Sequence, residues 1–293
     1  MRIPEEKLKE IYNYYLSHDI GLVKTTELFN ISYKTIQRYI KRNNLESTLK
    51  NKQIKMTFNS SYFHDLDSQE KMYWFGFLYA DGSITINEKK YIYKLSLCLQ
   101  ERDKNHLIKF AKALNLSVIE EKIKLEENSF STNSNKKFKA YRIYLCSKEL
   151  VTDLIKLGCI PRKTYEGILR KNLFLNKSKE LKLAFLRGYI DGDGTIHYKK
   201  WCVYISVYRK EIAEFIKWLI NDIFPEINVI IRFRENIKFK KNLILNNEKN
   251  GYYVVSIQHK EEAKEFLQEI YKNATIFLDA KYQIYLALEN ALR

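Results

Sequence analysis

The sequence predicts an α+β protein in which two related α/β repeats follow a small all-α domain. The segment WFGFLYADGSI (Trp74–Ile84) recurs 112 residues later as LRGYIDGDGTI (Leu186–Ile196). Alternating polar and apolar residues follow each copy, as in antiparallel strands with one buried face. The N-terminal residues instead carry apolar side chains at helical spacing. We therefore expect a helical domain at 1–48, a linker at 49–67, and repeats at 68–180 and 181–293.

The N-terminal domain is expected to form three short helices. Pro4 can open the first helix, a second pattern covers about Thr25–Phe29, and Ser32 is a candidate N-cap for a third helix at Tyr33–Arg42. The third segment resembles the recognition helix of a helix-turn-helix, which enters the major groove of DNA. An ordinary helical hairpin with a solvated basic face is the alternative. The outward face that would contact DNA carries Lys34, Gln37, Arg38, Lys41 and Arg42.

Period-2 alternation predicts strands whose apolar side lies under helices and whose other side is an open polar face. In the first repeat, Tyr91, Tyr93, Leu95, Leu97 and Leu99 alternate with more polar residues. The segments 141–145, 203–208 and 229–234 alternate in the same way. Basic residues of these faces could bind DNA, and those of the hairpins could also be solubilising charge. The candidates are Lys94, Ser96, Lys136, Lys137, Arg142, Tyr204, Arg232, Arg234, Lys238 and Lys240.

Small residues recur four positions apart in the repeated segments, at Gly76 and Ala80 and again at Gly188 and Gly192. Residues at this spacing share one helix face, so the two helices can pack backbone to backbone. Glycines at 82 and 194 fit as helix-ending residues. This packing would place two carboxylates together at the helix ends.

Those carboxylates are Asp81 and Asp193. They would repel each other and oppose the negative helix C-termini, unless cations occupy the site. Mg²⁺ takes oxygen ligands of this kind, and at such a site it could support phosphodiester hydrolysis. An EF-hand is excluded, because its register would put Tyr189 and Lys200 at ligand positions. The sequence therefore predicts a Mg²⁺ site between the repeats.

The two repeated segments resemble the paired motifs of the LAGLIDADG homing endonucleases. The resemblance implies that the penultimate acids of the motifs, Asp81 and Asp193, bind the metal, with the preceding Ala80 and Gly192 contributing to the same site. It also implies close helix packing at Gly76 and Gly188. The first motif has Tyr79 where the second keeps Asp191, a position that does not bind metal.

Further segments resemble the family over most of residues 69–293. LSLCLQERDK implies a supporting active-site role for Gln100, and its counterpart in the second repeat is either Ser206 or Tyr208. LGCIPRKT and TIFLDAKYQ imply catalytic lysines at Lys163 and Lys281. These lysines could stabilise the developing phosphate charge, and solvated surface charge is their alternative.

The family's fold implies two saddle-shaped antiparallel sheets related by a pseudo-twofold axis, which lie in successive major grooves. The resemblance then implies a monomer that makes a double-strand break at a long, asymmetric DNA site. Two alternatives stay open. One is a regulator that binds DNA but has lost cleavage, and the other is a maturase for group I intron RNA.

Composition agrees with a double-stranded DNA partner. The chain of 293 residues has 51 Lys and Arg against 35 Asp and Glu, a net charge of +16. No apolar run approaches the roughly 18 residues of a membrane span, so no membrane contact is expected. The four cysteines and five histidines are scattered, which excludes a zinc site and suggests cysteines that fill apolar gaps in a reducing compartment. The start of the chain has no apolar signal core, so we expect a cytoplasmic protein of bacterial, phage or organelle origin.

Overall fold

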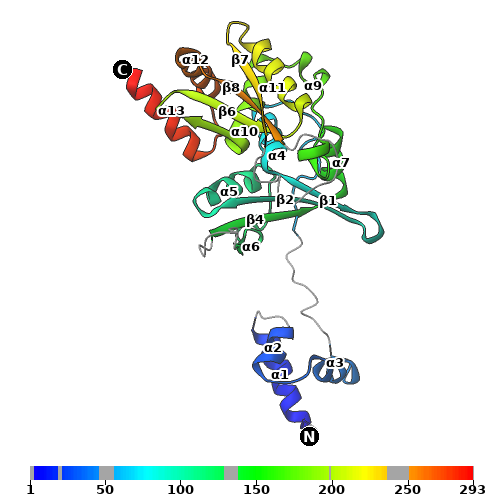
Figure 1. Ribbon diagram of the computed structural model, residues 1–293. Helices are drawn as coiled ribbons and strands as arrows, with labels where there is room; N and C mark the ends of the chain where they lie inside the picture. Colours follow the sequence, from blue (N-terminus) through cyan, green and yellow to red (C-terminus); the bar gives the residue numbers. More distant parts are fainter. Residues whose placement is uncertain are drawn as a thin grey trace. The chain divides into compact units, whose positions relative to one another are not determined.

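The computed structural model (Figure 1) describes residues 3–18, 22–45, 56–128, 138–197, 199–235 and 251–292. The chain forms two compact units, Met1–Met56 and Thr57–Arg293. Both helices and strands are present, so the α+β class predicted from the sequence is confirmed. Within the described ranges, no helix is both long and apolar enough to cross a membrane.

The first unit contains three short helices, α1 (Glu5–Ser17), α2 (Leu22–Leu28) and α3 (Tyr33–Arg42). Ser32 stands at the N-cap of α3, although its hydroxyl makes no capping hydrogen bond. Arg42 pairs with Glu5 at 2.7 Å and ties the end of α3 to the start of α1. The predicted apolar spacing produces a small core, which consists of Leu8, Ile11, Tyr12, Tyr15, Ile36, Tyr39 and Ile40.

The second unit is built around two antiparallel sheets with the same strand order, β1-β2-β4-β3 and β5-β6-β8-β7. One long helix leads into each sheet, α4 (Gln69–Asp81) into the first and α10 (Lys179–Asp193) into the second. Figure 1 shows these two helices at the centre of the unit, with one sheet on either side. The strands are β1 (Ser83–Asn87), β2 (Ile92–Gln100), β3 (Lys124–Asn128), β4 (Phe138–Cys146), β5 (Gly194–His197), β6 (Cys202–Val207), β7 (Val229–Glu235) and β8 (Gly251–Ile257).

Helices cover the sheets and connect their strands. In both repeats a helix that the sequence analysis did not predict follows the second strand, and apolar residues such as Phe110 and Phe215 pack it onto the sheet. The helices of the first repeat are α5 (Lys104–Ala113), α6 (Ile119–Lys122), α7 (Lys148–Lys156), α8 (Lys163–Glu166) and α9 (Asn172–Leu175). Those of the second are α11 (Lys210–Ile223), α12 (Lys260–Tyr271) and α13 (Asp279–Leu292). Two 3₁₀ turns, η1 (Glu88–Lys90) and η2 (Glu101–Asp103), flank β2.

The central helices α4 and α10 pack backbone to backbone, as the glycine spacing predicts. A Cβ atom added to Gly76 would collide with the carbonyl oxygen of Phe185, and one added to Gly188 would collide with that of Tyr73. Glycine is therefore required at both positions by close helix approach. Gly82 also ends its helix, but with an extended backbone (φ −68°) instead of the left-handed cap that such glycines often adopt.

Three details differ from the sequence expectations. Residues 57–67, expected to be linker, belong to the second unit, because Tyr62 and Phe63 are buried in it and Asn59 N donates to Leu114 O at 2.8 Å. Tyr91, expected in a buried strand face, lies in a turn with φ 51° and is 88% exposed. Cys146, expected to fill an apolar gap, is exposed at the end of β4.

Candidate active site

Asp81 and Asp193 are the last residues of α4 and α10, where the helix seam ends. A Cβ atom added to Gly192 would lie 3.4 Å from Oδ2 of Asp81, so the two last turns are in contact. Both carboxylates reach solvent, but protein atoms crowd them. This partial desolvation, together with the charge of Asp193, raises the pKa of Asp81 to about 7. Desolvation also raises the pKa of Asp193. Two free anions are therefore unfavourable here.

A lysine lies at the end of each central helix. Lys163 Nζ donates to the carbonyl oxygens of Ala80 at 2.9 Å and Gly82 at 2.5 Å. Lys281 Nζ donates to the carbonyl oxygens of Ile190 at 2.8 Å and of Gly194. Desolvation lowers the pKa of both ammonium groups, and the nearby aspartates act against this shift. The structure thus brings together both acids and both lysines singled out in the sequence.

The oxygen atoms at the seam fit a hard divalent cation. Two converging carboxylates supply negative charge, and the carbonyl of Ala80 points to the same end of the helix. That carbonyl already accepts from Lys163 and keeps one lone pair. Across the described ranges, no three or more His, Cys, Asp and Glu side chains form a metal-binding group. A cation held here would take its other ligands from water or phosphate, as Mg²⁺ commonly does.

The strand registers identify the counterpart of Gln100, which is exposed at the end of β2. Ser83 pairs with Ser96 in the first sheet, and the equivalent Thr195 pairs with Tyr204 in the second. Tyr204 therefore corresponds to Ser96, and four residues further on Tyr208 corresponds to Gln100. Of the two candidates left open by the sequence, the register selects Tyr208.

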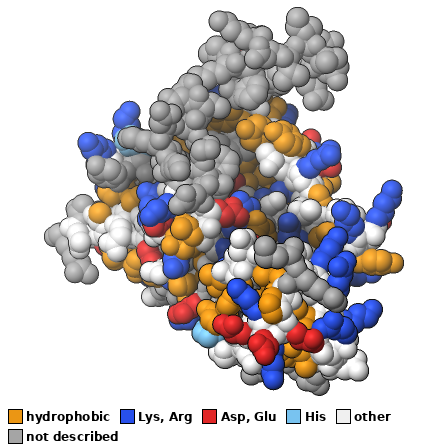
Figure 2. All heavy atoms as spheres, turned by 90° about the horizontal axis from the view of Figure 1, so that it is seen from below, with side chains coloured by type: hydrophobic (Ala, Val, Ile, Leu, Met, Phe, Trp, Pro, Cys, Tyr) orange, Lys and Arg blue, Asp and Glu red, His pale blue; other side chains and the backbone are white. Residues whose placement is uncertain are grey.

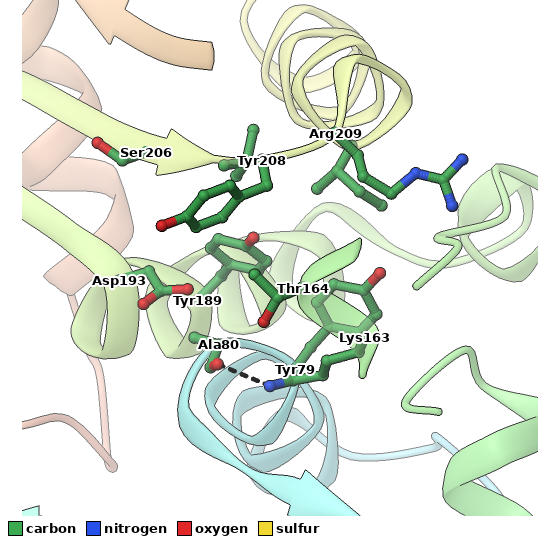
Figure 3. Close-up of a pocket in the computed structure, with 11 residues that line it drawn as sticks. Tyr79, Ala80, Lys163, Thr164, Tyr189, Asp193, Ser206, Tyr208 and Arg209 are labelled. Atoms are coloured by element: carbon green, nitrogen blue, oxygen red, sulfur yellow. Dashed lines mark hydrogen bonds between the residues drawn. The ribbon is translucent and has the colours of Figure 1, made fainter. Parts of the chain in front are cut away.

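A pocket of about 220 Å³ lies beside Asp193 (Figure 3). Lys163 and Thr164 of α8 line one part of it, and Tyr208 and Arg209 line another. In Figure 3 the hydroxyl of Tyr208 lies on the side of the pocket that holds Asp193. The sequence interpretation missed Thr164 and Arg209, which only the fold brings beside the acid.

Comparison with known proteins identifies part of the chain. Residues 180–271 match the sequence profile of the LAGLIDADG-like domain family. The match covers only part of the chain, most of the second repeat. No curated protein matches the chain in sequence. The family match over residues 180–271 confirms the resemblance carried by the second motif.

Solved structures extend the likeness to the fold of both repeats. The homing endonuclease I-WcaI, bound to its DNA recognition sequence, is 18% identical with a TM-score of 0.54, over 83% of this chain and 97% of its own. I-DmoI in complex with DNA and Ca is 16% identical with a TM-score of 0.47, over 79% and 99% of the two chains. Full-length DUF199/WhiA from Thermatoga maritima is 14% identical with a TM-score of 0.40, over 81% and 67%. The I-WcaI match shows the LAGLIDADG fold.

The two central helices, α4 and α10, differ at the position two residues before the acid. Asp191 is buried and accepts hydrogen bonds from Tyr73 Oη at 2.7 Å, Tyr271 Oη at 2.6 Å and Leu278 N at 2.7 Å. It thereby fixes the chain just before α13, the helix that carries Lys281. The equivalent Tyr79 is buried with no hydrogen-bond partner for its hydroxyl in the described part of the chain.

The candidate DNA-binding residues fall into four groups. Those of α3, together with Arg232 and Arg234, are exposed, while Lys94, Arg142 and Tyr204 are half-buried. Ser96 is buried beneath Arg142, whose Nη1 donates to the serine hydroxyl at 3.2 Å. Figure 2 shows Lys and Arg side chains spread over the visible face. The hairpin candidates Lys136, Lys137, Lys238 and Lys240 lie outside the described residues.

Proposed function

We propose that this chain is a site-specific endonuclease that hydrolyses both strands of double-stranded DNA with bound Mg²⁺. The observation that carries this proposal is the meeting of Asp81 and Asp193 at the end of one helix seam. The LAGLIDADG fold is shared with I-WcaI, a homing endonuclease bound to its DNA recognition sequence. A net charge of +16 suits a DNA partner.

The chemistry follows from the position of each group. Asp81 and Asp193 would hold the cation, with Ala80 and Gly192 packed together beside them. A bound Mg²⁺ supplies positive charge at the phosphodiester and lowers the pKa of coordinated water. Lys163 has three N–H donors and uses two on helix-end carbonyls, which leaves one for a phosphate oxygen or the attacking water. Lys281 would lie in the equivalent place in the other half, where its Nζ also contacts Asp191 O at 3.5 Å and would give up this long contact to donate to a phosphate oxygen.

Because the repeats are fused and differ in sequence, the enzyme would act as a monomer on a DNA site that need not be palindromic. The open strand faces would follow the DNA on both sides of the helix seam, and the N-terminal unit would add contacts. Such an enzyme would promote homing of the gene or intervening sequence that encodes it.

The proposal is tested by selecting cleaved molecules from a randomised DNA library in Mg²⁺, then cutting a plasmid that carries the recovered site. We expect linear plasmid with one cut position on each strand. A chain that binds the recovered site without nicking it would instead be a DNA-binding regulator. Stimulation of group I intron splicing that survives Asp81→Asn would indicate a maturase.

Arg38 of the exposed face of α3 provides a separate prediction for the N-terminal unit. Arg38→Ala is expected to weaken binding of the recovered site by about 5- to 100-fold, the range for one lost DNA contact, and to leave the cut position unchanged. Competition binding and sequencing of the cut ends measure both quantities. Lys9→Ala, which removes an exposed charge from α1, is the matched control. A shifted cut position would contradict this role.

A further inference from the structure

Each half of the active site combines a lysine of one repeat with the strand end of the other. On one side, Arg209 Nη1 donates to Gly167 O at 3.3 Å, at the end of the short helix that carries Lys163. On the other side, Lys109 Nζ donates to Phe277 O at 3.1 Å and to Asp279 at 2.6 Å, just before Lys281. In both halves a basic side chain of one repeat therefore holds the backbone beside the lysine of the other repeat, although Arg209 follows β6 and Lys109 lies on α5.

The side chains brought together by this exchange are not the same. The half that contains Lys163 has Tyr208 and Arg209, and the half that contains Lys281 has Gln100 and Glu101 at the equivalent positions. Two of these four side chains form ion pairs, and Gln100 and Tyr208 are exposed. Arg209 pairs with Glu211 at 3.1 Å, Glu101 lies 3.9 Å from Lys139, and Tyr208 is 49% exposed.

A second acid increases the difference. Asp103 follows Gln100 by three residues, and its side chain is only 13% exposed. Its negative charge acts on both Asp81 and Lys281. Arg102 lies 3.4 Å from Asp103 but is itself 71% exposed, where solvent screens its charge. The half that contains Lys281 thus holds Glu101 and the poorly exposed Asp103, whereas the half that contains Lys163 holds Arg209, which is paired with Glu211.

This difference bears directly on phosphodiester cleavage. Negative charge develops on the phosphate oxygens as the bond breaks, and donors aimed at that charge accelerate the reaction. A guanidinium can hold two phosphate oxygens at once, and a phenol O–H can hold one. A nearby carboxylate acts in the opposite direction. Lys163, Asp193, Tyr208 and Arg209 all line the pocket of about 220 Å³. In Figure 3 the hydroxyl of Tyr208 lies on the Asp193 side of the pocket, whereas the guanidinium of Arg209 points away from Asp193 and donates to Gly167 O.

We propose that this pocket, with Tyr208 and Arg209, is the dominant phosphate site, and that the DNA strand bound in it is cut before the other strand. The inference rests on the proposed endonuclease function and adds an order of strand cleavage to it. Tyr208 would donate a hydrogen bond to a non-bridging oxygen of the scissile phosphate, and Arg209 would supply positive charge. Gln100 would occupy the slower half.

Strand-specific cleavage of the recovered DNA site is the first test. With a different label on each strand, the wild-type protein should accumulate one nicked species, always cut on the same strand. Tyr208→Phe should slow cleavage of that strand about tenfold, as expected for one lost hydrogen bond to a charged group. Gln100→Ala should slow the other strand. Tyr91→Phe, the same change at an 88% exposed tyrosine at the opposite end of β2, should leave both rates unchanged.

Equal wild-type rates on the two strands would overturn the proposal, as would a Tyr208→Phe variant that slows both strands alike. Fluorescence melting checks that each variant is folded. Because Tyr208 is exposed and its change removes a single hydroxyl, this variant is expected to have the melting temperature of the wild type. A wild-type protein that cuts neither strand would refute the proposed endonuclease function, and the phosphate site is then decided by binding.

The binding test uses Ca²⁺ and duplexes in which single phosphates are replaced, one at a time, by uncharged methylphosphonates. Replacement of the phosphate held by Arg209 should weaken binding by the wild type by about tenfold. In the Arg209→Gln variant, the same replacement should leave the binding affinity unchanged at that one position, on one strand. If replacement at every position weakens binding by Arg209→Gln as much as it weakens binding by the wild type, the pocket does not bind a backbone phosphate and the inference fails.

Discussion

Asp81→Asn is expected to abolish double-strand cleavage while binding of the recovered DNA site is largely retained. The substitution keeps the shape of the side chain but removes one of two charges that would hold the cation between α4 and α10. The cleavage rate should fall by at least about a thousandfold, or roughly 4 kcal/mol of transition-state stabilisation. Cleavage under single-turnover conditions and a parallel binding isotherm measure the two properties.

The same variant also has a stability prediction that separates a functional acid from a structural one. Because Asp81 and Asp193 repel each other, removing one charge should leave the melting temperature unchanged or raise it. Asp193→Asn should behave alike. Asp67→Asn, which makes the same chemical change at an exposed ion pair with Lys71, should retain full cleavage. Full cleavage by either Asp81→Asn or Asp193→Asn would contradict the proposal that these acids are needed for catalysis.

Gly188→Ala is expected to destabilise the second unit by about 3 kcal/mol or more, although it adds only one methyl group. That methyl would collide with the carbonyl oxygen of Tyr73 and lie 2.9 Å from Phe77 N on the partner helix. Both atoms belong to the backbone of α4, so relief requires the helices to separate. Urea unfolding of the purified protein measures the change.

The sign of that change is diagnostic. Helix propensity alone predicts that alanine at an interior helical position is about 1 kcal/mol more favourable than glycine. Gly76→Ala should destabilise the unit in the same way, since its methyl would meet the Phe185 carbonyl. Gln69→Ala, at the exposed start of α4, serves as the control and should change stability by less than about 0.5 kcal/mol. A stabilised Gly188→Ala protein would mean that the helices do not pack closely.

The central architecture could be predicted because it depends on local spacing that recurs. Gly76 and Gly188 lie on the helix faces that meet, and the strand alternation correctly predicted that Leu95, Leu97 and Ile205 are buried. The helix ends then fixed where Asp81 and Asp193 lie. Repetition of the pattern strengthened each of these inferences.

The rest depends on contacts between segments distant in sequence. The buried carboxylate of Asp191 gains its role only when Tyr73 of α4, Tyr271 of α12 and Leu278 of the loop before α13 converge on it. The match of Tyr208 with Gln100 required the pairing of β5 with β6, since alternation alone does not align one repeat with the other.

Anomalous scattering from Mn²⁺ in crystals of the protein bound to its recovered DNA site would test the paired-acid centre most directly. We predict density for at least one ion bonded to carboxylate oxygens of Asp81 or Asp193 and to a phosphate oxygen of the DNA, and loss of that density in the Asp81→Asn, Asp193→Asn double variant. A DNA complex with no ion at these two carboxylates would contradict the proposed centre.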